Sequence, residues 1–538
     1  MLMHVSRLLS VIAMLGLCVM CADPVPSQEL VPPLVQLQPP QVESEVPKGV
    51  EVLARGPVHE AFASPSSEPK ATPHLGKKPP APLEEMPPDE KPEGDVVWIG
   101  GYWSWDDDRG DYLWVSGCWR VKPTDKEWVP GYWREVGGNW QYAPGFWTNA
   151  QATRAQAVTY YPEPPAAPNL APPGEPPGQD MFHVPGYWMW TGDRFAWRAG
   201  YWTRVRPDHV YVPSHYRWTP YGYVFVAGYW DYTIARRGVL YAPVVVDVVV
   251  VGPRYVYTPR YAVRDTIVLD TLFVRASCGS YYFGDYYGPR YVAIGYEPSV
   301  VYSRRYYEPI VVHQRWVYRD NPRWHDTQVA LVIERHSGRA PVPPRTLVQQ
   351  NIIVHKNVTN VTNVTNVTNV IAPTRTVVAA RGQSVVPIDK ATRAQVRDAT
   401  QAVQQTMAAD RRKTETAPTI GGSAPLTKPR TASLNVSQTS PVAPIGLGAA
   451  KNPPPPLKMP PLTNLPTRPG DLSKNPFQGD PKGISGPIPP KDRVKTSPTA
   501  PAPTPLIGNP PRDAGKGNPP IPPSKTKKPP EETKKKGL

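Results

Sequence analysis

The chain has 538 residues, of which 74 are proline, 17 tryptophan and 28 tyrosine, but only 8 are phenylalanine. Proline at about three times its usual frequency, with so little phenylalanine, excludes a single large enzyme built around an ordinary apolar core. The formal net charge of +15 favours contacts with anionic surfaces.

The first 22 residues have the pattern of a secretory signal. Leu8 to Ala22 form an almost unbroken apolar run after the basic residue Arg7. This run is shorter than the roughly 20 residues of a membrane-spanning helix, and its length is typical of a signal peptide. We therefore predict a signal peptide over residues 1–22 and a mature protein that is secreted, periplasmic or associated with the cell envelope. An uncleaved or lipid-modified anchor is the alternative.

Two long segments have the composition of disordered chain. Residues 23–94 are rich in Pro, Glu and Lys, and residues 413–538 are rich in Pro and Lys. Such segments bury too little apolar surface to offset the entropy of ordering. We predict a disordered linker over 23–94 and a disordered tail over 413–538, whose final lysines would contact anionic surfaces.

Residues 95–235 contain 15 of the 17 tryptophans and carry an internal repeat. A glycine followed by an aromatic residue and tryptophan recurs, mostly at a spacing of 14 residues. The copies are Gly101-Tyr102-Trp103, Gly131-Tyr132-Trp133, Gly145-Phe146-Trp147, Gly186-Tyr187-Trp188, Gly200-Tyr201-Trp202 and Gly228-Tyr229-Trp230. Copies at Cys118 and Ser214 depart from this pattern. Another aromatic residue usually stands three positions before the glycine.

A unit of about 14 residues is too short for a strand and a helix, but it suits a hairpin. Residues 187–190 alternate as a strand, residues 191–194 have turn chemistry, and residues 195–197 return. The ordered part is therefore expected to be all-β, a meander of short aromatic-rich strands with long disordered Pro-rich flanks. We expect the motif glycines at strand junctions, where a positive φ would require them.

These motifs carry a resemblance to a known family. The stretches that carry it are Trp128 to Trp133, Tyr142 to Trp147 and Trp197 to Trp202. They resemble the YXWGXW (also written WXXGXW) repeats of secreted or envelope-associated bacterial proteins. The resemblance covers about a quarter of the chain, and the family brings no established biochemical activity.

The remaining segments are less regular. Residues 236–330 are rich in Val, Tyr and Arg and are expected to form further short strands, among them 266–274. Residues 331–412 contain an Asn-Val-Thr repeat from Asn357, interpreted as simple-sequence expansion or as a polar ladder in an oligomeric stalk. Within them, 390–412 has helical periodicity, and the helix could pair with a second copy. Cys118 and Cys278 remain after signal cleavage; we expect them to be unpaired, and a single bridge between them is the alternative.

No pattern for catalysis or cofactor binding stands out. The clustered carboxylates Asp106 to Asp108 lie in an expected hairpin loop, without the environment of a paired acid and base. They also lack the spacing of a calcium loop. The histidines are scattered, so we predict no catalytic residue, no metal site and no cofactor.

The sequence favours a non-enzymatic structural or interaction scaffold of the bacterial cell envelope, with the repeat glycines and aromatic residues as its contact surface. Its expected partners are envelope polymers or proteins, glycans among them, and itself, but not nucleic acid. The alternative is a carbohydrate-binding module that stacks tryptophan and tyrosine on peptidoglycan or exopolysaccharide.

Overall fold

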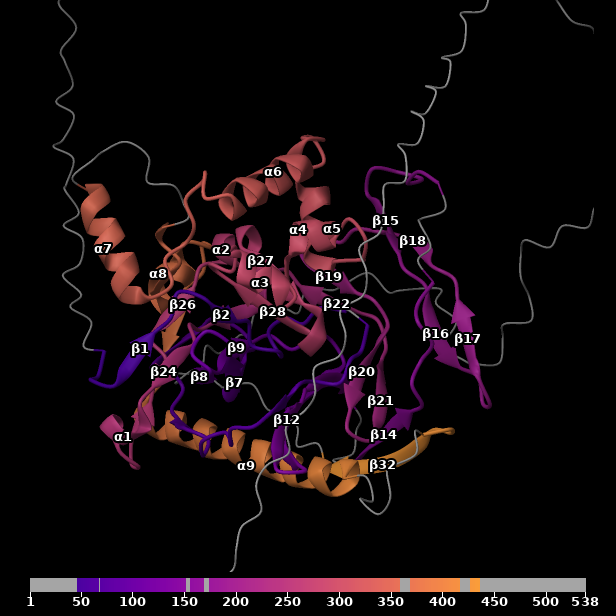
Figure 1. The fold of residues 1–538 in the computed structure, drawn as a ribbon, viewed down its shortest axis with the longest axis horizontal. Helices are drawn as coiled ribbons and strands as arrows, with labels where there is room; N and C mark the ends of the chain where they lie inside the picture. Colours follow the sequence, from indigo (N-terminus) through magenta and orange to yellow (C-terminus); the bar gives the residue numbers. More distant parts are fainter. Residues whose placement is uncertain are drawn as a thin grey trace, which may run out of the picture. The chain divides into compact units, whose positions relative to one another are not determined.

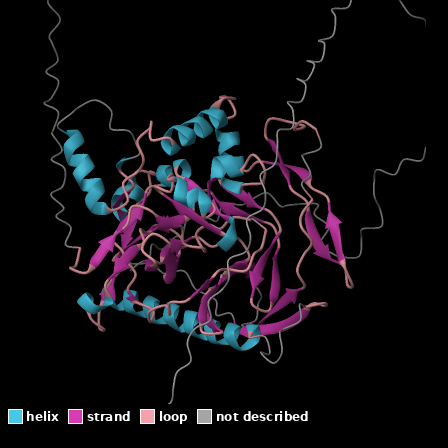
Figure 2. Ribbon diagram, in the orientation of Figure 1, coloured by secondary structure: helices cyan, strands magenta, loops and turns pink. Residues whose placement is uncertain are grey.

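The computed structural model describes residues 46–66, 68–150, 155–168, 174–358, 368–416 and 426–435. Short strands dominate this part of the chain, and helices occur mainly towards its C-terminal side (Figure 2). The expected strand-rich fold with many short hairpins is confirmed. The predicted signal peptide lies outside the described residues, as does most of the tail. Among the described helices, none is long and apolar enough to cross a membrane.

The repeats form four modules of one design, each with four strands and of equal length (Figure 1). Module 1 (residues 97–120) contains β6 (Val97–Ile99), β7 (Tyr102–Asp106), β8 (Asp111–Val115) and β9 (Cys118–Arg120). Module 2 (126–149) contains β10 (Lys126–Val129), β11 (Tyr132–Val136), β12 (Asn139–Ala143) and β13 (Phe146–Asn149). Module 3 (181–204) contains β15 (Met181–Val184), β16 (Tyr187–Trp190), β17 (Phe195–Arg198) and β18 (Tyr201–Arg204). Module 4 (209–232) contains β19 (His209–Val212), β20 (His215–Thr219), β21 (Gly222–Val226) and β22 (Tyr229–Tyr232).

In every module the middle two strands form a hairpin and the outer two strands pair with each other, all antiparallel. Two residues separate each outer strand from the inner strand that continues it, and the second is the motif glycine or Ser214. The first is often proline, which has no N–H to donate to a ladder. Each module is thus one long hairpin, bent at a corner in each strand.

The segment before module 1 is not a disordered linker where the structure describes it. It forms β1 (Val50–Val52), β2 (Gly56–Pro57), β3 (His74–Leu75), β4 (Glu84–Glu85) and β5 (Glu90–Pro92). Val58, Ala61 and Phe62 are buried. The guanidinium groups of Arg120 and Arg237 donate to the carbonyls of Ala61 and Phe62, both at 2.9 Å. The predicted disorder of 23–94 is therefore corrected for 46–66 and 68–94, because these residues are held by partners far along the chain.

Residues 236–330 contain helices as well as the expected strands. The strands are β23 (Gly238–Leu240), β24 (Val244–Val246), β25 (Val256–Tyr257), β26 (Tyr261–Val263), β27 (Leu272–Arg275), β28 (Ser280–Phe283) and β29 (Tyr296–Pro298). The helices are α1 (Val248–Val251), α2 (Asp265–Asp270), α3 (Pro289–Ala293), α4 (Ser299–Tyr302), α5 (Pro309–Val317) and α6 (Trp324–His336). The prediction of a strand over 266–274 is wrong for its first part, which belongs to α2, and its second part lies in β27. Asp265 in the first turn favours this helix, whose Ile267 and Val268 are buried.

Beyond α6, the described chain contains α7 (Leu347–Val358), β30 (Ile371–Pro373), α8 (Thr374–Ala379), β31 (Val385–Pro387), α9 (Lys390–Glu415) and β32 (Arg430–Asn435). The helix expected over 390–412 is confirmed as α9. Most of the Asn-Val-Thr repeat lies outside the described residues. The expected disorder of the tail is corrected for 413–415, which belong to α9, and for 430–435, because β32 pairs antiparallel with β14 (Ala155–Tyr161).

The main core joins the N-terminal segment to modules 1 and 2 and to residues 234–283 and 370–371. Phe62, Trp103, Trp114, Trp147 and Phe283 all belong to it. Module 3 contributes nothing to this core, and Val184 is its one fully buried residue. The four modules therefore share a design but differ in how deeply they are buried.

Candidate functional site

The repeat brings its aromatic residues together in cross-strand pairs, one on each side of the corner. In module 1, Trp98 pairs with Trp119 and Trp103 pairs with Trp114, with ring centroids 5.1 Å and 5.2 Å apart. The corresponding pairs in the other modules are Trp128–Trp147, Trp133–Tyr142, His183–Trp202, Trp188–Trp197, Tyr211–Trp230 and Tyr216–Phe225. Each motif thus gives its first aromatic residue to one pair and its last to the other.

The predicted site residues divide by module into buried and partly open. Trp103, Tyr132, Phe146 and Trp147 are buried in modules 1 and 2. In module 3, Gly186, Tyr187, Trp188 and Trp202 are partly exposed, and Tyr201 is 48 % exposed. The remaining predicted residues, Gly101, Tyr102, Gly131, Trp133, Gly145, Gly200, Gly228, Tyr229 and Trp230, lie at corners or beside them in their modules.

The motif glycines are required by close contact and not by a positive φ, which corrects the expectation from sequence. Positive φ occurs instead at hairpin tips such as Gly110 (58°) and Gly192 (101°). A Cβ on Gly117 would stand 2.5 Å from Cζ2 of Trp98 and 2.6 Å from the carbonyl oxygen of Ile99. The first aromatic residue of one motif therefore lies against the glycine of the other motif in its module, and a methyl group would not fit.

Two buried glutamates from the N-terminal segment occupy the corners of modules 1 and 2. The Glu85 carboxylate accepts hydrogen bonds from the backbone N–H of Gly101 (2.8 Å), the N–H of Gly117 (2.9 Å) and the indole Nε1 of Trp114 (3.1 Å). Burial raises the pKa of Glu85 to about 7, although these three hydrogen bonds lower it. The bent strands leave these amides outside the ladders, and the carboxylate satisfies them.

Glu60 has the same role in module 2. Its carboxylate accepts from the N–H of Gly145 at 3.0 Å and from the hydroxyl of Tyr142 at 2.7 Å. Burial raises its pKa as well, against these hydrogen bonds. Sequence reasoning missed both glutamates, because nothing in their local sequence indicates that they meet glycines far along the chain.

Helix α9 binds the carbonyl groups at the same two corners. The Gln404 side chain donates to the carbonyl of Gly100 at 3.0 Å. The Arg411 guanidinium donates to Pro130 (2.8 Å) and Pro144 (3.0 Å), and it also pairs with Glu415 at 2.7 Å. Arg411 and Glu415 are both fully buried. This side of α9 is therefore covered by the modules, so the expected pairing of α9 with a second copy could not use it.

A cleft of about 770 Å³ lies between α9, modules 1 and 2 and a proline-rich stretch at residues 79–83. Its lining includes the aromatic side chains of Trp133 and Trp140 and the polar side chains of Gln401, Gln405 and Arg412. Aromatic faces beside amide and charged groups are typical of a site for a polar ligand.

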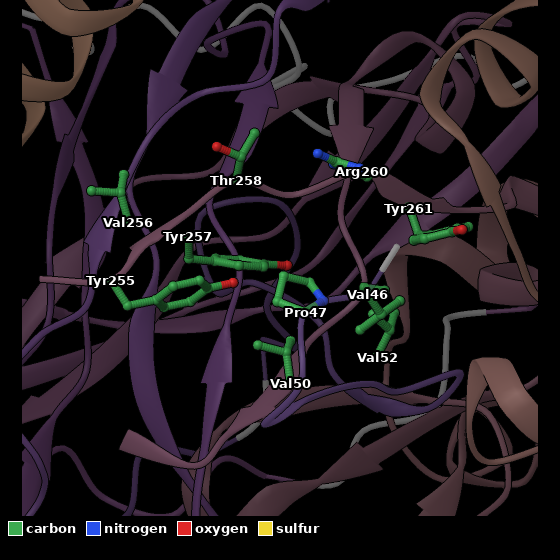
Figure 3. A pocket seen from close by; sticks show the side chains of 11 residues that line it. Val46, Pro47, Val50, Val52, Tyr255, Val256, Tyr257, Thr258, Arg260 and Tyr261 are labelled. Carbon is green, nitrogen blue, oxygen red and sulfur yellow. The ribbon is translucent and has the colours of Figure 1, made fainter. Parts of the chain in front are cut away.

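A second cavity, of about 240 Å³, lies at the corner of module 3. Gly186, Gly200, Trp197 and His183 line it, together with Arg305 and other residues from outside the module. A third pocket of about 140 Å³, between β1 and β25–β26, is lined mainly by valine and tyrosine side chains and offers little chemistry (Figure 3).

The clustered carboxylates of the β7–β8 loop are paired with arginines. Asp107 bonds Arg275 at 2.6 Å, and Asp108 contacts Arg55 and Arg290. No group of three or more His, Cys, Asp or Glu among the residues with defined structure could hold a metal ion. Cys118 and Cys278 are both free.

The family model described as WXXGXW repeat (2 copies) matches residues 95–120, 184–203 and 206–230. These three stretches fall on modules 1, 3 and 4, so two copies of the motif correspond to one bent hairpin. The chain therefore carries WXXGXW repeats, as the sequence indicated. Module 2 has the same strand order outside the matched stretches. No curated protein and no solved structure matches this chain.

Proposed function

We propose that this protein is a non-enzymatic interaction scaffold of the bacterial cell envelope, and that module 3 is its contact surface. The observation that carries this proposal is the unequal burial of one repeated design. Modules 1 and 2 bury three of their four aromatic pairs, Trp98–Trp119, Trp103–Trp114 and Trp128–Trp147, where these pairs stabilise the fold. Module 3 keeps the same pairs but leaves them partly open to solvent.

Exposed aromatic residues support a role in recognition. Tyr and Trp give large contact areas at low entropic cost, and they are enriched in protein interfaces. Trp188, Trp190 and Tyr201 give module 3 such residues outside the core, where burial does not account for their retention. The formal charge of +15 adds attraction to the anionic polymers of an envelope.

Carbohydrate binding is the second candidate, and the cleft beside α9 favours it. Trp133 and Trp140 could stack on the apolar faces of sugar rings there, while Gln401, Gln405 and Arg412 could bind hydroxyl groups. This candidate places the site at modules 1 and 2 and not at module 3.

Co-sedimentation of the purified protein with isolated cell envelopes tests both candidates. The scaffold proposal expects Trp190→Ala to weaken sedimentation without lowering the melting temperature by more than a few degrees, and Trp140→Ala to leave sedimentation unchanged. Binding to purified peptidoglycan or exopolysaccharide that is lost in Trp140→Ala would support the carbohydrate candidate instead. Equal sedimentation of wild type and Trp190→Ala would refute module 3 as the contact surface.

A further inference from the structure

The corner of module 3 has the donors of a carboxylate site but no carboxylate. In module 1 these donors are two glycine amides and the indole of Trp114, and Glu85 binds all three. The equivalent groups in module 3 are the N–H groups of Gly186 and Gly200 and Nε1 of Trp197. None of these three has a hydrogen-bond partner among the described residues, and Nε1 of Trp197 is buried.

Such a group of donors is costly without a ligand. A buried donor without a partner costs about 1–3 kcal/mol, and Nε1 of Trp197 is such a donor, with the partly exposed N–H groups of Gly186 and Gly200 at the same corner. The other corners confirm the pattern: module 2 uses Glu60, and module 4 satisfies the amide of Gly228 with the hydroxyl of Ser214 at 2.9 Å. Among the described residues, each of the other three modules has a partner for at least one of its two corner amides, and module 3 has a partner for neither.

The proline-rich segments beside modules 1 and 3 show what is missing. In module 1, Trp103 donates its indole N–H to the carbonyl of Ala81 at 2.9 Å, in a Pro-Pro-Ala stretch that leads to Glu85. In module 3, Trp188 donates to the carbonyl of Ala166 at 3.2 Å, in a second Pro-Pro-Ala stretch. After Ala166 the sequence has no acidic residue until Glu175. The docking element is therefore repeated without its glutamate.

We propose that the corner of module 3 binds the side-chain carboxylate of a glutamate carried on an extended, proline-containing segment of a partner polypeptide. This inference rests on the proposed contact surface and names its partner class. The cavity of about 240 Å³ can admit a side chain, and Gly186, Gly200 and Trp197 all belong to its lining. Glu60 and Glu85 are the precedents, because both reach their corners from segments rich in proline.

One residue of this chain competes for the role. Glu68 lines the same cavity, is exposed, and makes no hydrogen bond to Gly186, Gly200 or Trp197. The test must therefore distinguish a carboxylate supplied by a partner from one supplied by Glu68.

The probe is a synthetic peptide with the sequence of residues 79–86, added to the full chain labelled with ¹⁵N at tryptophan. We expect a saturable shift of the Trp197 indole signal, assigned by its absence in Trp197→Phe. A peptide carrying Gln in place of Glu85 should bind at least tenfold more weakly, because an amide has one acceptor oxygen where Glu85 accepts through both of its oxygens. Trp197→Phe should also weaken binding of the native peptide about tenfold by fluorescence anisotropy, whereas the matched control Trp218→Phe, in β20 of module 4 and outside the lining of this cavity, should not.

Four results would overturn the proposal. Equal binding of the Glu and Gln peptides would show that no carboxylate is recognised. Tighter binding to Glu68→Gln than to wild type would show that Glu68 already fills the corner. Displacement of the peptide by glucuronate at equal concentration would identify an acidic sugar as the ligand. If the peptide fails to bind while Trp190→Ala still loses envelope sedimentation, this inference fails and the contact surface remains.

Discussion

Replacing Gly117 by alanine tests whether close packing at the corner holds a module together. The new Cβ would stand 2.5 Å from the Trp98 ring, 2.6 Å from the Ile99 carbonyl oxygen and 2.9 Å from Oε2 of Glu85. Trp98 is only 2 % exposed and the carbonyl is backbone, so neither can move aside cheaply. Overpacking costs about 1–3 kcal/mol, and disturbing the Glu85 hydrogen bonds adds about 1–3 kcal/mol. We expect a total loss of about 2–6 kcal/mol.

Urea unfolding followed by tryptophan fluorescence measures this loss, with Gly110→Ala as the matched control. Gly110 lies at the tip of the β7–β8 hairpin, has a φ of 58°, and has nothing within 4 Å of an added Cβ. The control should lose only the roughly 1–2 kcal/mol of a left-handed backbone. If the two variants have the same unfolding midpoint, contact at the corner is not what requires glycine.

Three further predictions follow from the buried charges and the thiol. Burial raises the pKa of Glu85 to about 7, so its contribution to the free energy of unfolding is full below about pH 4.5 and decreases by roughly 3 kcal/mol as pH rises to 7. Urea titrations at pH 5 and pH 8 should show this decrease in stability. The Glu85→Gln variant should lose this pH dependence. Arg411→Met leaves the buried Glu415 carboxylate bonded to the hydroxyls of Tyr132 and Tyr160 but without a cation and should cost about 3–5 kcal/mol in thermal melts, whereas adding Glu415→Gln, which removes the charge, should restore part of the loss. Cys118 is buried and its pKa is raised by that burial, so mass spectrometry should find it alkylated by iodoacetamide only after unfolding.

The inner hairpins could be predicted from the sequence because their signals are local. The alternation over 187–190, the turn at 191–194 and the return strand follow one another along the chain, and β16 and β17 confirm them. The outer pairs could not be predicted in the same way. Trp98 and Trp119 meet only because a complete hairpin lies between them, and a spacing of 14 residues does not distinguish this pairing from a simple meander.

Of the candidate site, only the residues of the repeated motif could be predicted from the sequence. The motif glycines and tryptophans were visible as a pattern, but the glutamates that bind the corners were not. Glu60 and Glu85 lie in a proline-rich segment whose composition indicates disorder. Their order comes from long-range contacts, such as the hydrogen bond from Gly145 to Glu60, which a residue-by-residue estimate of entropy and hydrophobicity does not include.

The pairing of two motifs within one module also limits how such a chain can change in length. The two motifs of a module complete each other. The first aromatic residue of one motif covers the glycine of the other motif, and the last aromatic residue of one pairs with the first aromatic residue of the other. A single inserted motif would leave its aromatic rings and its glycine without counterparts, whereas an inserted pair would bring both halves. We therefore expect homologous chains to gain or lose these motifs in twos. Because every such contact closes within a stretch as short as 97–120, a duplicated module could fold from local contacts without rearranging its neighbours.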